Sequence, residues 1–191
     1  MKNKQLAAIV IGTLFAAVTQ LAIAKGPNYT YAEIGYINLD GDNVEGNGGG
    51  VNISYGATDH IFVKMGYAHF NLDTPDADAD RFQIGLGGHM EVAKDIDVLG
   101  ALSYVDIEFS NGVPVSGDDG YLAEIGVRGM VNKKFELNAT VSQLDVGGGS
   151  DTGFGIGAVG KIAKKFWLTG GYRQFQDDDE GELFLGVRLK L

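Results

Sequence analysis

The stretch ELFLGVRLKL, residues 182–191, places an apolar residue at every second position. Leucine or valine occupies positions 183, 185, 187, 189 and 191, and Arg188 and Lys190 fall between them. Successive side chains of a β-strand point to opposite faces, so this period of two predicts a strand with one apolar and one polar face. Its length also matches the roughly ten residues that a tilted strand needs to cross a hydrocarbon core.

The same alternation recurs from Tyr29 onward. Short polar stretches separate ten such segments, at 29–39, 48–57, 61–71, 80–90, 96–109, 120–131, 135–145, 152–162, 166–176 and 182–191. Segments joined by short connections pair antiparallel with their neighbours along the chain. The pattern therefore predicts an all-β fold, an up-and-down antiparallel barrel of ten strands, with eight or twelve strands as alternatives.

The two faces of these segments differ sharply in chemistry. One face carries Ala32, Ile34, Tyr36, Val51, Ile53, Tyr55, Ile61, Val63, Met65, Tyr67, Phe82, Ile84, Leu86, Tyr121, Ala123, Ile125 and Val127. The other carries Glu33, Gly35, Asn52, Ser54, Lys64, Arg81, Gln83, Glu124, Arg128, Glu136, Asn138, Thr140, Arg173 and Arg188. A soluble sandwich turns its apolar face inward, whereas a membrane barrel turns it toward lipid. Periodicity alone does not choose between them.

The aromatic residues do distinguish the two folds. If the first segment runs outward, one set of aromatics falls at the outer strand ends: Tyr36, Tyr67, Phe82, Phe109, Tyr121, Phe154 and Tyr172. Tyr55, Phe135 and Phe166 fall at the inner ends. Two aromatic bands around an aliphatic belt are typical of a transmembrane barrel, because amphipathic rings settle at the two lipid–water interfaces. The sequence therefore predicts a membrane barrel.

The connections support this interpretation. Four are tight (57–60, 91–95, 132–134 and 163–165), and five are longer and mostly acidic or glycine-rich (40–47, 72–79, 110–119, 146–151 and 177–181). The two kinds alternate, as periplasmic turns and extracellular loops do in outer-membrane barrels. Both ends of the barrel domain should then lie on the periplasmic side.

The first residues predict export. Two lysines precede an apolar run from Leu6 to Ile23, which closes on the small-residue pattern Ala22-Ile23-Ala24. This order predicts a signal peptide at 1–24 that is cleaved, with an uncleaved anchor as the alternative, and a barrel domain at 25–191. Cleavage would change the formal charge from −10 to −12, since Lys2 and Lys4 leave with the peptide. There is no cysteine, so disulfides cannot hold the fold, and the acidic balance argues against nucleic acid.

The chain's last strand resembles the terminal signal of Gram-negative outer-membrane proteins that the barrel-assembly machinery reads. Gly186-Val187-Arg188-Leu189-Lys190-Leu191 carries this likeness, although the family usually closes on an aromatic residue. The opening Tyr29-x-Tyr31-x-Glu33-x-Gly35-Tyr36 looks like the first strand of small porin-family barrels. Their relatives of the OmpX, Ail and opacity type usually have eight strands. The resemblance implies an outer-membrane location and contact with lipid and lipopolysaccharide.

Charged residues on the inward parity are the first candidate site. They are Glu33, Lys64, Arg81, Glu124, Arg128, Glu136, Arg173, Glu182 and Arg188. Glu33 and Arg188 become neighbours when the barrel closes, and Arg173 and Glu182 lie on adjacent strands. Charges away from water are found paired, so one interpretation is a polar network that plugs a narrow lumen. The other is a small pore whose charges tune selectivity.

Acidic loops form the second candidate. The carboxylates are Asp73, Asp76 and Asp78 in one loop and Asp177, Asp178 and Asp179 in another. Crowded carboxylates could hold a divalent cation weakly and bridge to lipopolysaccharide phosphates. A solvated hydrophilic tip is the simpler interpretation, because the spacing matches no established calcium loop. No confident metal site and no cofactor are predicted.

A rim hydrolase is the third hypothesis. Asp106 and Glu108 are expected to face inward near the outer rim and could form a carboxylate pair. His69 lies on the lipid-facing parity, and His60 and His89 lie near the periplasmic end. We therefore expect no enzyme, but a monomeric barrel that serves envelope integrity or surface contact through its short acidic loops. A narrow porin-like channel for small solutes is the competing function.

Overall fold

A computed structural model of the chain describes residues 26–41, 45–73, 77–110, 116–176 and 181–191. The strands are β1 (Tyr31–Asp40), β2 (Gly46–Gly56), β3 (Ile61–Leu72), β4 (Asp78–Ala93), β5 (Ile96–Ser110), β6 (Ser116–Asn132), β7 (Phe135–Val146), β8 (Gly149–Lys161), β9 (Phe166–Phe175) and β10 (Gly181–Lys190). Within the described residues, no helix is long and apolar enough to cross a membrane. The predicted signal peptide, residues 1–24, lies outside them.

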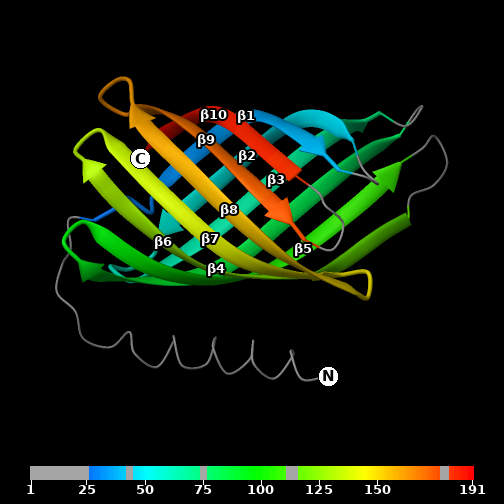
Figure 1. Ribbon diagram of the computed structural model, residues 1–191, viewed down its shortest axis with the longest axis horizontal. Coiled ribbons are helices and arrows are strands. Elements are labelled where there is room, and N and C mark those ends of the chain that lie inside the picture. Colours follow the sequence, from blue (N-terminus) through cyan, green and yellow to red (C-terminus); the bar gives the residue numbers. More distant parts are fainter. Residues whose placement is uncertain (1–25, 42–44, 74–76, 111–115, 177–180) are drawn as a thin grey trace.

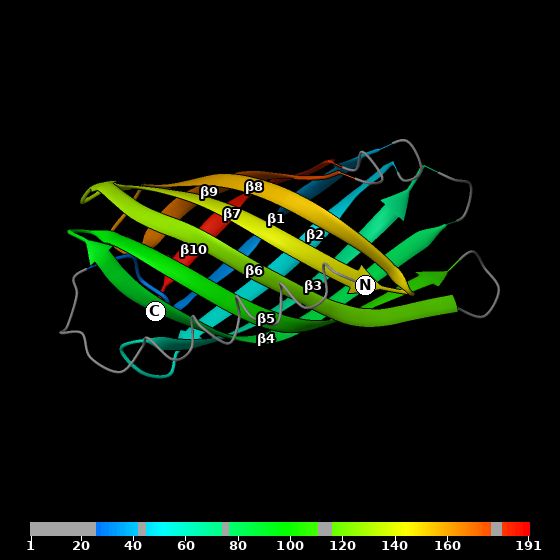
Figure 2. The same cartoon turned by 60° about the horizontal axis from the view of Figure 1, so that its bottom comes forward.

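Each strand pairs antiparallel with the next, and the sheet closes on itself (Figures 1 and 2). Closure is made by β1 and β10, which pair from Tyr31 opposite Lys190 to Asp40 opposite Gly181. The predicted up-and-down antiparallel barrel of ten strands is confirmed, and the alternatives of eight or twelve strands are wrong. Predicted and observed strand bounds differ by a few residues at most, with the largest difference at the start of β6.

The two ends of the barrel differ in their connections. Short turns join β2 to β3, β4 to β5, β6 to β7 and β8 to β9, at the end where the described chain begins with Gly26 and finishes with Leu191 (Figure 1). Following the usual arrangement of outer-membrane barrels, we call this the periplasmic end and the opposite one the outer end.

One connection contradicts the predicted alternation of short turns and long loops. β7 ends at Val146 and β8 begins at Gly149, so only Gly147 and Gly148 join them. Their φ angles are 59° and 80°, and positive φ at both central positions is what a tight type I′ hairpin turn requires. The glycines that suggested a loop instead make the tight turn possible.

The outward face is apolar and the inward face is charged. Ile34 is 65% exposed and Ile156 is 67% exposed, whereas Arg128 and Arg188 are 6% and 5% exposed. Water would favour the reverse arrangement, because exposed apolar area and buried charge both cost free energy. The outer surface of the barrel is therefore suited to lipid, and its interior is the polar compartment.

Phe109 lies at the outer end of its strand as predicted, but the prediction that it faces lipid is wrong. It has the parity of Ser103 and Val105, which are 1% and 2% exposed, so it belongs to the inward face of β5. β5 carries apolar residues on both faces, so its alternation was too weak to set the parity. Tyr36, Tyr67, Tyr121, Phe154 and Tyr172, at the outer ends of their strands, are all exposed as predicted.

Leu86→Arg should destabilise the barrel. Leu86 lies in the middle of the aliphatic belt between Val63 and Leu102 on the neighbouring strands. A cation on the lipid face near the bilayer midplane costs about 2–4 kcal/mol. Urea unfolding of the protein in lipid vesicles measures this loss, with Ala163→Arg in the exposed β8–β9 turn as the control. Equal stability of the two variants would contradict the lipid-facing assignment.

Candidate functional site in the barrel lumen

Alternation along the strands brings the inward charges into one lumen. The inward positions of the strands also include glycines, among them Gly155, Gly157 and Gly171. Because glycine has no side chain, these positions leave room for long side chains from the opposite wall. A Cβ at Gly157 would lie 2.7 Å from Asn138 Oδ1, so even one added carbon would contact a neighbouring polar group. The lumen is thus shaped by a few long charged residues and many small ones.

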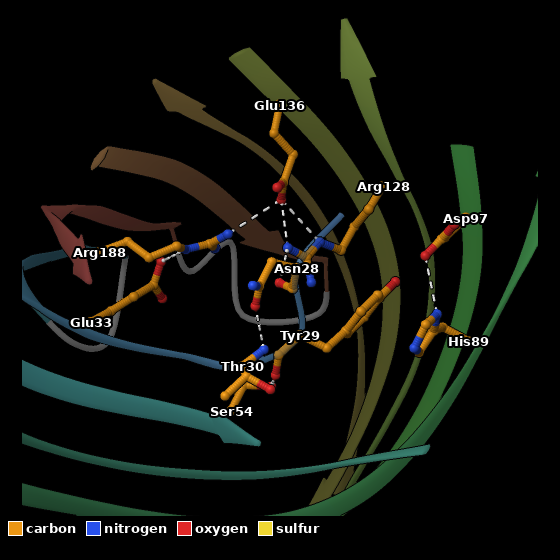
Figure 3. A network of polar contacts seen from close by, with 10 residues as sticks. All are labelled: Asn28, Tyr29, Thr30, Glu33, Ser54, His89, Asp97, Arg128, Glu136 and Arg188. Carbon is orange, nitrogen blue, oxygen red and sulfur yellow. Dashed lines mark hydrogen bonds and ion pairs between the residues drawn. The ribbon is translucent and has the colours of Figure 1, made fainter. Parts of the chain in front are cut away.

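The first layer of charges lies in the periplasmic part of the lumen (Figure 3). Glu136 on β7 is fully buried, and its Oε1 accepts bonds from Arg128 Nη2 at 2.6 Å and from Arg188 Nη1 at 3.3 Å. Arg188 Nε also donates to Glu33 Oε1 at 2.7 Å. Arg188 lies on β10, so its bond to Glu136 on β7 crosses the lumen and joins strands that are not neighbours.

The segment before β1 enters this layer. Arg128 Nη2 donates to the carbonyl of Asn28 at 3.2 Å, and Ser54 Oγ donates to the carbonyl of Tyr29 at 2.7 Å. Tyr29 is 6% exposed. The centre of its ring lies 3.7 Å from the centre of the His89 ring and 4.4 Å from Cζ of the Arg128 guanidinium. Burial raises the pKa of the Tyr29 hydroxyl well above its usual range, so the phenol stays protonated.

An Asp–His pair borders the same layer. His89 Nδ1 lies 3.0 Å from Asp97 Oδ2, and Asp97 is 1% exposed. The second oxygen of Asp97 and the hydroxyl of Tyr29 are both buried and have no hydrogen-bond partner among the described residues. Sequence reasoning missed this part of the site. The alternation along the strands could have revealed it, because Tyr29, His89 and Asp97 lie on the inward faces of β1, β4 and β5 or directly continue them.

A second layer crosses the centre of the lumen. Glu124 on β6 contacts both Lys64 Nζ on β3 and Arg173 Nη2 on β9, the latter at 3.1 Å. These three strands lie well apart around the barrel, so the group spans its width. Burial raises the cost of each charge, and the mutual attraction of the three groups offsets it.

Arg81 and Glu182 make a further bridge toward the outer end. Arg81 Nη1 and Nη2 donate to the two Glu182 oxygens at 2.6 and 3.0 Å, a two-bond contact between β4 and β10. The sequence places Arg173 opposite Glu182 on the adjacent strand, and the backbone register does pair them. Their side chains nevertheless bind partners across the lumen, Glu124 for Arg173 and Arg81 for Glu182.

An apolar cluster lies beside this bridge near the outer end. Ile37, Ala68, Phe70 and Ala79 are buried together, and Phe184 packs against them. The Arg81 guanidinium lies 5.2 Å from the centre of the Phe70 ring. The inward position of Phe184 was predicted, whereas Ile37, Ala68, Phe70 and Ala79 were not, because the lumen was assigned mainly by its charges.

Between the layers lies a chamber of about 290 Å³. Its wall includes Asn52, Thr140, Gly155, Gly171 and Phe184, and charged residues of both layers reach into it. The five inward cations of the layers each contact a carboxylate: Lys64, Arg81, Arg128, Arg173 and Arg188. Their partners are the four carboxylates Glu33, Glu124, Glu136 and Glu182, so the surplus is a single positive charge, where Lys64 and Arg173 share Glu124.

The acidic loops are only partly described. Asp76, Asp177, Asp178 and Asp179 lie outside the described residues. Asp73 follows β3 directly and Asp78 begins β4. The part of the chain that the structure describes holds no group of three or more His, Cys, Asp or Glu residues that could bind a metal ion.

The predicted inward carboxylate pair at the rim is wrong. Asp106 and Glu108 alternate with the inward Val105 and Ile107, so both point away from the lumen. Asp106 Oδ2 instead accepts a bond from the outward Tyr104 hydroxyl at 3.3 Å. The cause is again the weak alternation of β5. The rim-hydrolase hypothesis thereby loses the pair on which it rested.

No protein-family model matches the sequence, and no curated protein matches it. Solved structures do resemble the fold. The NanC porin is similar with a TM-score of 0.53 and 11% identity, over 85% of this chain and 100% of that one. The KdgM porin in complex with disordered oligogalacturonate has a TM-score of 0.50 and 14% identity, over 85% and 99%.

An outer membrane channel from Pseudomonas putida F1 is also similar, with a TM-score of 0.51 and 10% identity, over 90% of this chain and 99% of that one. At these identities the likeness concerns the fold. The chain has the fold of small outer-membrane β-barrels.

Glu136→Gln should be strongly destabilising. It would remove the carboxylate that Arg128 and Arg188 share, and loss of one partner from a buried pair costs about 3–5 kcal/mol. Chemical unfolding of the folded barrel measures the change, with Glu45→Gln, exposed at the outer end, as a control. Adding Arg128→Gln to the first variant should restore part of the loss. An unchanged unfolding midpoint in Glu136→Gln would show that the layer contributes no stability.

Proposed function

We propose that this chain is an outer-membrane barrel whose lumen stays closed to solutes, and that it serves the envelope as a structural barrel rather than as an open pore. The observation that carries this proposal is the direction of the ion pairs. Four of them join strands that are not neighbours: Arg188 with Glu136, Glu124 with both Lys64 and Arg173, and Arg81 with Glu182. Side chains that bond across a pore occupy the path that a solute would follow.

The balance of charge supports the same function. A selective pore concentrates one sign of charge along its path, as rings of like residues do in channels. Here every cation of the two layers and of the Arg81–Glu182 bridge contacts a carboxylate, and the five cations exceed the four carboxylates by a single charge, so the lumen holds no ring of one sign. A ten-strand barrel also encloses little more space than side chains can fill.

Contacts with the envelope belong to the same proposal. The acidic outer connections, including Asp73 and Asp78, would face the medium and meet lipopolysaccharide, with divalent cations bridging to its phosphates. β10 would present the terminal strand to the barrel-assembly machinery, and the chain would work as a monomer after its signal peptide is cleaved. No enzymatic activity is part of this proposal.

A narrow channel for small solutes is the second candidate. It is favoured by the chamber between the layers, which has about 290 Å³ and a polar wall, and by the similarity to the KdgM and NanC porins. In such a channel the ion pairs would have to separate for each opening. The two candidates therefore differ in one observable, the current through the folded barrel.

In planar lipid bilayers the wild-type barrel should show no stable openings, because both charge layers obstruct the lumen. The KdgM porin, measured in the same bilayers, is the positive control. Alanine at Arg128, Glu136 and Arg188 clears only the periplasmic layer, so this variant should also stay closed. Clearing the central layer and the Arg81–Glu182 bridge as well, with alanine at Lys64, Arg81, Glu124, Arg173 and Glu182, should produce openings.

Stable wild-type openings would reject the closed barrel in favour of the channel. If the fully cleared variant folds but stays closed, the ion pairs are not what closes the lumen. Folding of every variant is verified by its heat-dependent mobility in gel electrophoresis.

A further inference from the structure

The cations outside the charge layers gather at one end of the molecule. Lys94, Lys133, Lys134, Lys164 and Lys165 lie in periplasmic turns, and Lys161 and Lys190 end the strands beside them. The outer end instead carries carboxylates, among them Asp40, Asp73, Asp78, Asp145 and Asp151. The described barrel is thus positive at its periplasmic rim and negative at its outer rim.

Two neighbouring turns carry the same three residues. Lys133-Lys134-Phe135 joins β6 to β7, and Lys164-Lys165-Phe166 joins β8 to β9. The amide of Lys161, the last residue of β8, donates to the carbonyl of Lys134 at 2.8 Å, so the two turns lie side by side. Both are at the end of the barrel marked C in Figure 1.

The four turn lysines are free to bind an anion. Each of Lys133, Lys134, Lys164 and Lys165 is exposed, and no described carboxylate makes an ion pair with any of them. The phenylalanine that follows each pair is exposed on the lipid-facing side. Aromatic rings at this position mark the lipid–water interface, so the lysines lie at the level of lipid headgroups.

An apolar groove on the lipid face begins beside the β6–β7 turn. It has a volume of about 710 Å³ and crosses the outward side of β5 to β9. Val131, Leu137 and Ile156 contribute to its wall, and the small side chains of Ala139 and Ala158 make it hollow. Val131 is only two residues before Lys133, so the groove ends beside the β6–β7 turn, and the β8–β9 turn with the second lysine pair lies next to that turn.

We propose that the groove and the four turn lysines form a binding site for one anionic phospholipid of the periplasmic leaflet. The lysine ammonium groups would hold the headgroup phosphate, and an acyl chain would lie in the groove. A lipid of zwitterionic headgroup would leave the lysines without a net counter-charge. A second copy of the chain is a poorer occupant, because twofold symmetry would bring lysines against lysines. Lipopolysaccharide is also a poorer occupant, because it lies in the opposite leaflet.

Native mass spectrometry of the full folded barrel tests the site. The protein is released from micelles that contain equal amounts of phosphatidylglycerol and phosphatidylcholine with identical chains. Wild type should retain phosphatidylglycerol preferentially. Lysine near an anionic surface strengthens binding about fivefold per residue, so glutamine at all four turn lysines should lower the preference at least about tenfold. Asp59→Gln, in the exposed β2–β3 turn on the side of the barrel opposite β7 and β8, should not lower the preference.

The groove is tested separately with Ala158→Leu, which fills it while keeping the lipid face apolar. This variant should retain less phosphatidylglycerol than wild type, although its lysines are intact. Two double variants should each lose part of the preference for phosphatidylglycerol: Lys133→Gln/Lys134→Gln and Lys164→Gln/Lys165→Gln. They replace the fourfold variant if it does not fold.

Three results would overturn the site. These are an equal retention of both lipids by wild type, a preference that survives the lysine substitutions, and full retention by Ala158→Leu. Binding of glycerol phosphate as tightly as the complete lipid would likewise exclude a role for the groove.

Discussion

Pairing between β1 and β10 is the constraint on which the rest of the structure depends. Lipid offers no hydrogen-bond partner to a backbone amide or carbonyl, so a sheet that crosses the membrane must leave no free edge. Ten backbone pairs between the first and last strands remove both edges at once. Closure then decides which side of every strand is inside, because it turns one face of the whole sheet toward lipid and the other toward a narrow lumen.

A second constraint is that the space inside the barrel must be filled, and long charged side chains occupy much of it. Glycines such as Gly155 and Gly171 leave a space too wide for aliphatic residues to fill by themselves. Arginine and glutamate reach across it and satisfy one another, as Arg188 and Glu136 do at the periplasmic layer and Arg81 and Glu182 do toward the outer end. Pairs of this kind link strands that are not neighbours, and in the proposed closed barrel the same contacts would also obstruct the lumen.

Much of this arrangement could be predicted from residue order, because strand order and alternation are local properties. The neighbours Glu33 and Arg188 follow from closure, and Arg173 opposite Glu182 follows from the register of adjacent strands. What could not be predicted is the partner across the lumen, because it depends on the radius of the barrel and the reach of each side chain. Glu124 therefore binds Arg173 from three strands away. The orientation of Asp106 was also missed, because β5 is apolar on both faces and its pattern does not reveal which one is inside.

The proposed closure of the chamber by charge layers at both ends is tested by the access of a reagent to Thr140. Thr140 lines the chamber, and the chain has no cysteine, so Thr140→Cys provides a single reactive thiol. A membrane-impermeant thiol reagent is added to either side of the barrel reconstituted in vesicles, with Ala163→Cys in the exposed β8–β9 turn as the reactive reference. If the chamber is closed, Thr140→Cys stays unlabelled from both sides while the reference reacts. Labelling of Thr140→Cys at the rate of the reference, from either side, would contradict it.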